Sequence, residues 1–241
     1  MVQSGSQIVE GGCYHVKTSR GGHHFKITAK RKRIRISIAS EGWPFILVPA
    51  GGALLLYWLG WPKVALGMGL LALFMAYFFR DPERVPPKRE GVVLAPADGK
   101  VVEIREVTDH FVGPGRRVSI FLSPLDVHIN RAPIGGLVVG VEYRAGRFLP
   151  AYRAEASEVN EQATIRLQGQ DLRVTVTQIA GVLARRVVCR LRGGEKLQAG
   201  ERFGMIRFGS RVDLILPQGV GIEALVGDRV RGGESIIGAF V

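Results

Sequence analysis

The chain has 241 residues, 46% of them hydrophobic and 22% charged, and it carries a formal net charge of +12. This composition fits one full-sized folded domain with an appendage, and it excludes a disordered or low-complexity chain. The two cysteines, Cys13 and Cys189, are too few for a disulfide framework or a metal cluster, so we expect a reducing compartment and no metal. The excess of positive charge favours an anionic partner, either nucleic acid or a lipid surface.

Residues 1–40 are predicted to be a basic N-terminal extension. Sequence rich in Gly, Ser and His leads into a run from Lys30 to Ile38 in which basic and apolar residues alternate. This run is typical of a short strand or of an arm lying on anionic headgroups, where each cation contributes about 1 kcal/mol. A tail without defined structure is the alternative. His23 and His24 are adjacent but have no further ligands nearby, so they predict no metal site.

Residues 41–80 are predicted to be a membrane-anchoring hydrophobic hairpin. Lys63 is the only charged residue between Trp43 and Phe79. At ~1.5 Å per residue the segment is long enough for one generous bilayer crossing or two short ones. The break at Gly60–Lys63 divides it into halves of about 17 residues, which favours two helices joined by a turn. The alternative is a helix pair buried in the core of a soluble protein.

The flanks of this segment indicate its orientation. Aromatic residues lie near its ends, where amphipathic rings prefer the headgroup region. Basic residues lie on both sides of it: Lys26, Lys30, Arg31, Lys32, Arg33 and Arg35 before, and Arg80, Arg84, Lys88 and Arg89 after. Because positively charged flanks stay in the cytoplasm, we expect both ends on the cytoplasmic face of the cell membrane.

Residues 81–241 are predicted to form a β-rich domain. A proline-stiffened linker at 80–87 is followed by short runs of strand-forming residues separated by Gly, Pro and Asp. Two segments, 197–204 and 225–233, repeat a Gly–acid–Gly pattern that is typical of tight turns between strands. The fold class expected is mainly β, barrel-sandwich-like, preceded by the helical hairpin. The runs that predict strands cover 92–104, 116–124, 137–143, 163–167, 172–181, 185–191, 211–217 and 221–226.

Several motifs of this region resemble the phosphatidylserine decarboxylase family, in its short form. In chain order they are FFRDPER at Phe78–Arg84, APADGKV at Ala95–Val101, SPLDVHINRAPIGG at Ser123–Gly136 and the run Gly204–Pro217 around FGSR. ASEVNE at 156–161 and ARRVVC at 184–189 extend the resemblance, which covers about Trp43 to Val241.

The resemblance implies that the chain is a proenzyme that cleaves itself between Gly209 and Ser210. The Ser210 hydroxyl would attack the preceding carbonyl, and the resulting ester would be eliminated. This chemistry leaves a pyruvoyl cofactor, derived from Ser210, at the start of the second chain. The two products would remain together as a heterodimer, and a homo-oligomer is compatible with the sequence.

Serine needs a base to take its proton and a group to orient that base. The resemblance implies a relay of Asp98, His128 and Ser210. Asp126 lies two residues from His128, so we expect it to be structural and to fix the loop. Without the resemblance, Asp98 would be read as part of an Asp-Gly turn and His128 as a core histidine.

In the implied reaction, the pyruvoyl ketone forms a Schiff base with phosphatidylserine and acts as the electron sink for loss of CO2. His128 would protonate the resulting carbanion, and hydrolysis would release phosphatidylethanolamine. The long form of the family has a second histidine where this chain has Arg131, so the role of that histidine does not transfer. The candidates for binding the lipid phosphate are arginines in or beside the matching segments: Arg131, Arg185, Arg186 and Arg207.

Two other functions are compatible with parts of the sequence. A membrane-anchored carrier or scaffold module would remain one intact chain, and no lysine suited to modification stands near either predicted turn. A nucleic-acid-binding β-barrel would explain the high charge. However, the basic run lacks the interleaved aromatic residues on which bases stack, so no nucleic acid partner is expected.

Overall fold

The computed structural model describes residues 8–9, 12–13, 36–150, 155–182, 187–207 and 210–240. The chain divides into two compact units, Met1–Arg35 and Ile36–Val241. In the first unit, strands β1 (Ile8–Val9) and β2 (Gly12–Cys13) pair antiparallel. The predicted domain limits at residues 40 and 80 both fall inside the second unit, and they stay predictions.

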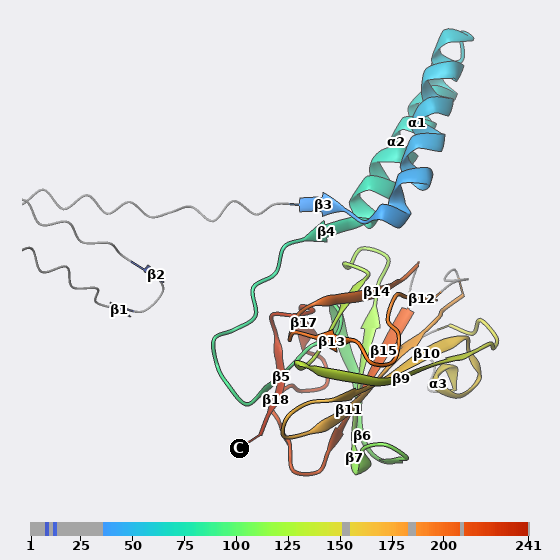
Figure 1. Cartoon of the computed structure of the whole chain (residues 1–241). Helices are drawn as coiled ribbons and strands as arrows, with labels where there is room; N and C mark the ends of the chain where they lie inside the picture. Colours follow the sequence, from blue (N-terminus) through green and yellow to red (C-terminus); the bar gives the residue numbers. More distant parts are fainter. Residues whose placement is uncertain are drawn as a thin grey trace, which may run out of the picture. The chain divides into compact units, whose positions relative to one another are not determined.

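The second unit begins with the predicted hairpin of two helices. After a short 3-10 turn, η1 (Ser40–Gly42), helices α1 (Trp43–Trp58) and α2 (Pro62–Phe78) lie side by side (Figure 1). Gly60 makes the turn between them with a φ of 79°, which favours glycine. Pro62 starts α2, where its missing N–H leaves no bond unmade. The ends of the hairpin are tied together by strands β3 (Ile36–Ile38) and β4 (Arg80–Pro82), which pair antiparallel.

The surface of the hairpin is apolar on several sides. Neighbouring residues such as Leu54 and Leu55 are both exposed, as are Leu70 and Leu71, although successive side chains of a helix point about 100° apart. At ~1.5 Å per residue, α1 is about 24 Å long. In the described part of the chain, no helix combines the length and the apolar character needed to cross a membrane.

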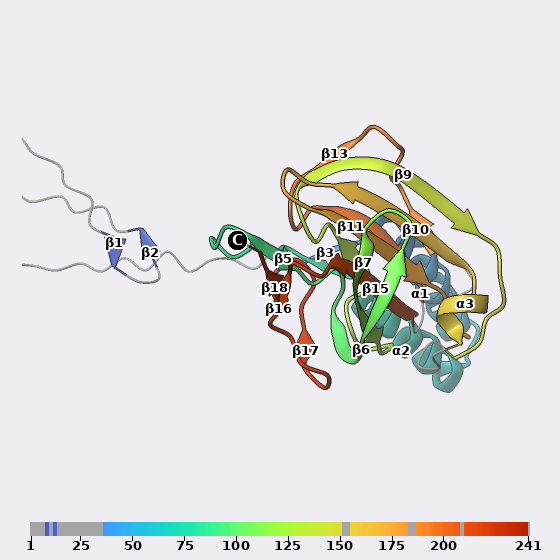
Figure 2. The ribbon, with the colours of Figure 1, turned by 90° about the horizontal axis from the view of Figure 1, so that it is seen from below.

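The β region is built on one curled, eight-stranded antiparallel sheet, as Figure 2 shows from below. A central strand, β15 (Ser210–Pro217), pairs with β11 on one side and β7 on the other. The order is β13 (Lys196–Leu197), β9 (Gly136–Arg144), β10 (Gln162–Gln168), β11 (Arg173–Ile179), β15, β7 (Gly113–Leu122), β6 (Gly99–Asp109) and β17 (Arg229–Val230).

Two three-stranded sheets and one short helix complete the described β region. One sheet consists of β12 (Val187–Cys189), β14 (Arg202–Ile206) and β8 (Ile129–Arg131). The other consists of β16 (Gly221–Ile222), β18 (Ile236–Ala239) and β5 (Val92–Leu94), and the helix is α3 (Ala156–Val159). The fold class predicted from the sequence, mainly β behind a helical hairpin, is confirmed.

Two hydrophobic clusters hold these layers together. The larger one joins the eight-stranded sheet to both small sheets through residues such as Val212, Phe203 and Ile237. The smaller one packs Phe78 and Phe79, at the end of α2, against residues beside and in β8 and β14. The base of the hairpin is therefore fixed next to the segment that contains His128.

Candidate active site

Ser210 is the first residue of the central strand β15 and is completely buried. Its Cα partner across the sheet is Leu122 of β7, so both neighbouring strands restrain the chain just after this position. Its hydroxyl has no hydrogen-bond partner in the described part of the chain. Gly209, the other half of the predicted cleavage site, lies outside the described residues. A buried hydroxyl without a partner is free to act as a nucleophile if a base is near.

His128 is also completely buried, and it comes directly before β8. Its Nδ1 lies 2.9 Å from the main-chain oxygen of Asp126. A carbonyl oxygen only accepts, so Nδ1 carries the proton and the lone pair of the neutral ring is on Nε2. The ring also packs on Phe78, with 4.3 Å between the ring centroids.

Burial lowers the pKa of His128 to about 4, against the smaller opposing effects of the main-chain bond and the charge of Asp126. The positive charge of Arg80 lowers this pKa further. The imidazole is therefore neutral at pH 7, as a general base must be.

The buried neutral imidazole predicts a specific loss of stability in acid. An unfolded histidine titrates near pH 6.5 and this one near 4, so between these values the unfolded chain binds more protons. The free energy of unfolding should thus fall by about 3 kcal/mol between pH 7 and pH 4 through this group alone. This fall is measured by urea unfolding at several pH values. The chain with His128 is compared with the His128→Gln variant, and both carry Ser210→Ala to prevent cleavage. An equal pH dependence in both chains would contradict the prediction.

Asp126 fixes the loop before His128, as the sequence predicted. Its carboxylate accepts a 2.8 Å hydrogen bond from the main-chain N–H of Ser123. The same residue therefore shapes the turn with its side chain and orients the imidazole with its main chain.

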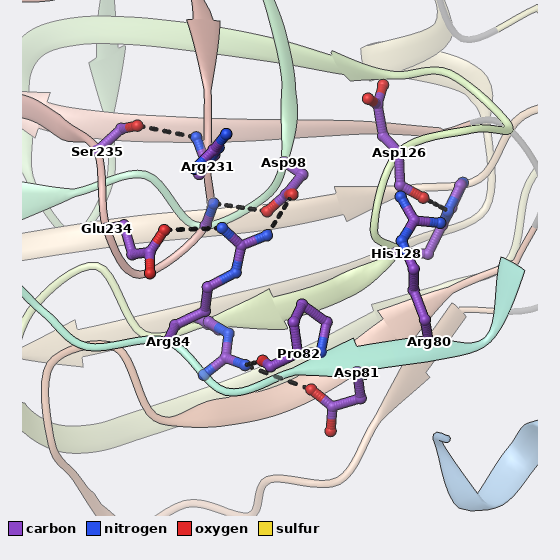
Figure 3. A network of polar contacts seen from close by, with 12 residues as sticks. Arg80, Asp81, Pro82, Arg84, Asp98, Asp126, His128, Arg231, Glu234 and Ser235 are labelled. Atoms are coloured by element: carbon purple, nitrogen blue, oxygen red, sulfur yellow. Dashed lines mark hydrogen bonds and ion pairs between the residues drawn. The ribbon is translucent and has the colours of Figure 1, made fainter. Parts of the chain in front are cut away.

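Asp98 lies in a second polar group, drawn apart from His128 in Figure 3. One of its carboxylate oxygens accepts from Arg84 at 2.7 Å and the other from the N–H of Gly232 at 2.8 Å. Arg84 also binds Glu234 at 2.8 Å. Burial raises the pKa of Asp98, and the charge of Arg84 opposes that rise. Asp98 thus holds Arg84 and the turn around Gly232, and its part in the relay stays a prediction.

Two buried amides that the sequence analysis missed join the strand after His128 to the strand beside Ser210. Gln178 of β11 donates a 2.7 Å hydrogen bond to Asn130 of β8, and both side chains are completely buried. Asn130 is two residues from His128, or about 7 Å along an extended chain. Gln178 pairs with Val212, two residues from Ser210 and on the same face of β15. These contacts bring His128 and Ser210 to the same interior.

The predicted phosphate-binding arginines have different surroundings. Arg131 is buried, and it donates to the carbonyls of Gly200 and Pro82 and to the Asp81 carboxylate. With Arg84 and Arg202 it lines a groove of about 550 Å3, whose arginines are paired with acids. Arg207 lies over the ring of Phe45 in α1, at 5.3 Å, and its buried Nε has no partner among the described residues. Arg185 and Arg186 lie outside the described residues.

Arg80 is a further cation near the site that sequence reasoning did not single out. It donates to the main-chain oxygens of Tyr77 and Leu125, and its guanidinium lies 3.9 Å from the centre of the Tyr77 ring. Figure 3 shows it extending toward Asp126 and His128. Its place in the FFRDPER motif was the available signal. Within the described ranges, no three His, Cys, Asp or Glu side chains are arranged to hold a metal ion.

Comparison with known proteins shows the family of the chain. A family model described as phosphatidylserine decarboxylase matches residues 71–238. A phosphatidylserine decarboxylase proenzyme of Symbiobacterium thermophilum is 47% identical over 205 residues, covering 83% of this chain and 94% of the relative. Proenzymes with the same name from Salinibacter ruber (47% identity; 78% and 86% covered) and Chlorobium limicola (44%; 74% and 85%) are also similar. The chain belongs to the phosphatidylserine decarboxylase family.

Proposed function

We propose that this chain is a proenzyme that cuts itself between Gly209 and Ser210 and then converts phosphatidylserine to phosphatidylethanolamine and CO2. Family membership supports the reaction. The observation that carries the proposal is the buried hydroxyl of Ser210, which has no partner among the described residues. It lies on the same sheet face as Gln178, which bonds to Asn130 in the segment of a neutral His128.

In the self-cleavage, His128 is the base that takes the proton of the Ser210 hydroxyl through Nε2. The hydroxyl oxygen attacks the carbonyl carbon of the preceding residue, and the amide becomes an ester. The carbonyl of Asp126 keeps the imidazole in the required tautomer. Loss of the Ser210 α-proton to a base then eliminates the ester, which frees the first chain with a terminal carboxylate and leaves dehydroalanine at position 210. Addition of water to this enamine and loss of ammonia give the pyruvoyl ketone.

The pyruvoyl group formed from Ser210 supplies a ketone that accepts the substrate amine and withdraws electrons from the bond to CO2. The chain offers a suitable interior for it, since position 210 is buried on the same sheet face as Gln178, whose Oε1 has no hydrogen-bond partner among the described residues. His128 is the residue that returns a proton to the substrate carbon.

The two chains are expected to remain a heterodimer after cleavage. Strand β15, the beginning of the second chain, is paired along both edges. Arg211, next to the cut, is also completely enclosed and binds Asp213 at 2.7 Å, Glu103 at 2.8 Å and Ser119 at 2.6 Å. These bonds hold the new terminus in place while the first residue does chemistry.

The hairpin is proposed to anchor the enzyme to the cytoplasmic face of the cell membrane. Its exposed apolar side chains need an apolar environment, and its base packs beside His128. Arg80 and Arg207 lie at this base, one over Tyr77 and one over Phe45. They are the cations best placed for the phosphate of a lipid that stays in the bilayer.

Membrane attachment can be tested by placing charges on the hairpin. Leu54 and Leu70 are both exposed, and replacing both with Glu puts two carboxylates into the apolar layer. Each should cost about 2 kcal/mol or more, so co-flotation with anionic vesicles should fall at least 100-fold. The matched control is Leu225→Glu, an equally exposed leucine of the β region. Equal flotation of the double variant and the control would contradict the anchor.

An intact-mass spectrum of the purified chain, together with CO2 release from vesicles, tests the proposed function. The proposed function predicts two species, residues 1–209 and residues 210–241, and the second has a blocked N-terminus. The carrier or scaffold alternative predicts a single species of 26.3 kDa and no CO2.

A further inference from the structure

Asn130 and Gln178 form an amide pair in the interior between β8 and β11. The 2.7 Å bond from Gln178 Nε2 to Asn130 Oδ1 uses only one end of each amide. The other ends, Asn130 Nδ2 and Gln178 Oε1, are buried and have no partner in the part of the chain described. An interior donor and acceptor left unmet in this way are destabilising, so their presence requires another explanation.

A glycine opposite Asn130 leaves room for these two amide side chains. Asn130 pairs across the small sheet with Gly204, where an added Cβ would come within 2.9 Å of Gln178 Nε2. Gln178 and Ser210 are diagonal neighbours on one face of the large sheet, about 7–8 Å apart, which is within reach of a long side chain and a small ligand. Gln178, with Asn130 bonded to it, thus lies on the same sheet face as the residue on which the proposed chemistry occurs.

We propose that this amide pair binds the reacting end of the substrate, and the inference rests on the proposed function. Asn130 Nδ2 donates to the α-carboxylate, and Gln178 Oε1 accepts from the N–H of the α-amine. A free amino acid end presents an acceptor and a donor side by side, which matches the two unmet atoms. The pair would therefore distinguish a lipid amine that carries a carboxylate from one that does not.

A neutral amide suits a carboxylate that must leave. During decarboxylation the negative charge would leave the carboxylate and move toward the electron sink derived from Ser210. A cation fixed on the carboxylate would stabilise the bound substrate more than the transition state and would slow the reaction. An amide N–H is neutral, so it orients the carboxylate while stabilising the bound substrate less than a cation would.

Reductive trapping of lipid amines on the mature enzyme tests the inference without relying on turnover. Cyanoborohydride, which reduces the imine but not the free ketone, is added with either phosphatidylserine or phosphatidylethanolamine in detergent. The intact mass of the 210–241 chain reports the amine attached, and with phosphatidylserine the adducts with and without CO2 are counted together. Asn130→Leu keeps the volume and removes the amide. It should lower the initial trapping rate of phosphatidylserine by about 10- to 100-fold and change that of phosphatidylethanolamine less than about 3-fold.

Two further variants separate the parts of the pair. Gln178→Met should lower trapping of both lipids by about 3- to 10-fold, because both carry the amine. Thr177→Val, on the same strand but on its other face, is the matched control and should change neither. Equal loss for both lipids in Asn130→Leu, or no loss, would overturn the assignment of the carboxylate.

The outcome distinguishes this inference from the proposed function. If the function is wrong, the unmodified chain is not cleaved and traps neither lipid. If only the inference is wrong, the unmodified chain traps both and the Asn130 variant shows no selectivity. Should Asn130→Leu fail to cleave, Asn130→Ala serves the same comparison. If both fold, by an unchanged unfolding transition, yet remain uncleaved, the pair acts in self-cleavage and the inference fails.

Discussion

Ser210→Ala is expected to abolish both self-cleavage and decarboxylation. Alanine has no oxygen to attack the preceding carbonyl, so neither the ester nor the ketone can form. The side chain is completely buried and its hydroxyl has no partner in the described ranges, so the replacement removes no described hydrogen bond of the fold. Denaturing gels and intact mass should show one uncut chain, and CO2 release should fall to background.

A second buried serine provides the control. Ser119 lies on the neighbouring strand β7 and faces the other side of the sheet, where its hydroxyl accepts from Arg211 at 2.6 Å. Ser119→Ala should cost about 1 kcal/mol of stability and still be cut. If Ser210→Ala chains were cleaved, or if they released CO2, the proposed origin of the cofactor would be wrong.

Much of the fold could be predicted because its signals are local. Lys63 and the Gly60–Pro62 break define the hairpin, and alternating short runs define the strands. The ends of the individual strands were less predictable. The run 92–104 is two strands, β5 and β6, because Asp98 turns the chain and binds Gly232 far along the sequence. Of the run 221–226, only Gly221–Ile222 forms a strand, β16. The main-chain N–H of Leu225 instead donates to the Asp228 carboxylate in a turn.

The site was predictable only where a motif names its residues. Ser210 and His128 stand in recognisable motifs, but the Asp126 oxygen that binds the His128 ring belongs to the main chain, and no side-chain pattern encodes such a contact. Gln178 is one of several polar residues in the run 172–181, and nothing local indicates that it meets Asn130, 48 positions away. Such contacts depend on the register between β11 and β15 and on the layering of two sheets.

His128→Gln is expected to slow self-cleavage by about 100- to 10,000-fold, the usual contribution of a general base. Glutamine can still donate to the carbonyl of Asp126 and fills a similar volume, but it cannot take a proton from Ser210. Time courses of cleavage after cell-free synthesis, resolved on denaturing gels, measure the rate. His110→Gln is the control, because His110 is an exposed histidine in the turn between β6 and β7.

The pH dependence of that rate separates a base from a merely structural histidine. With a pKa of about 4, His128 is unprotonated above about pH 5, so cleavage should rise up to that point and then level off. A histidine with an ordinary pKa would instead produce a rise centred near pH 6.5. In the His128→Gln chain the acid limb should disappear and leave a slow rate that no longer follows this titration. Cleavage of this variant at the original rate would place the base elsewhere, and a surviving acid limb would assign the titration to another group.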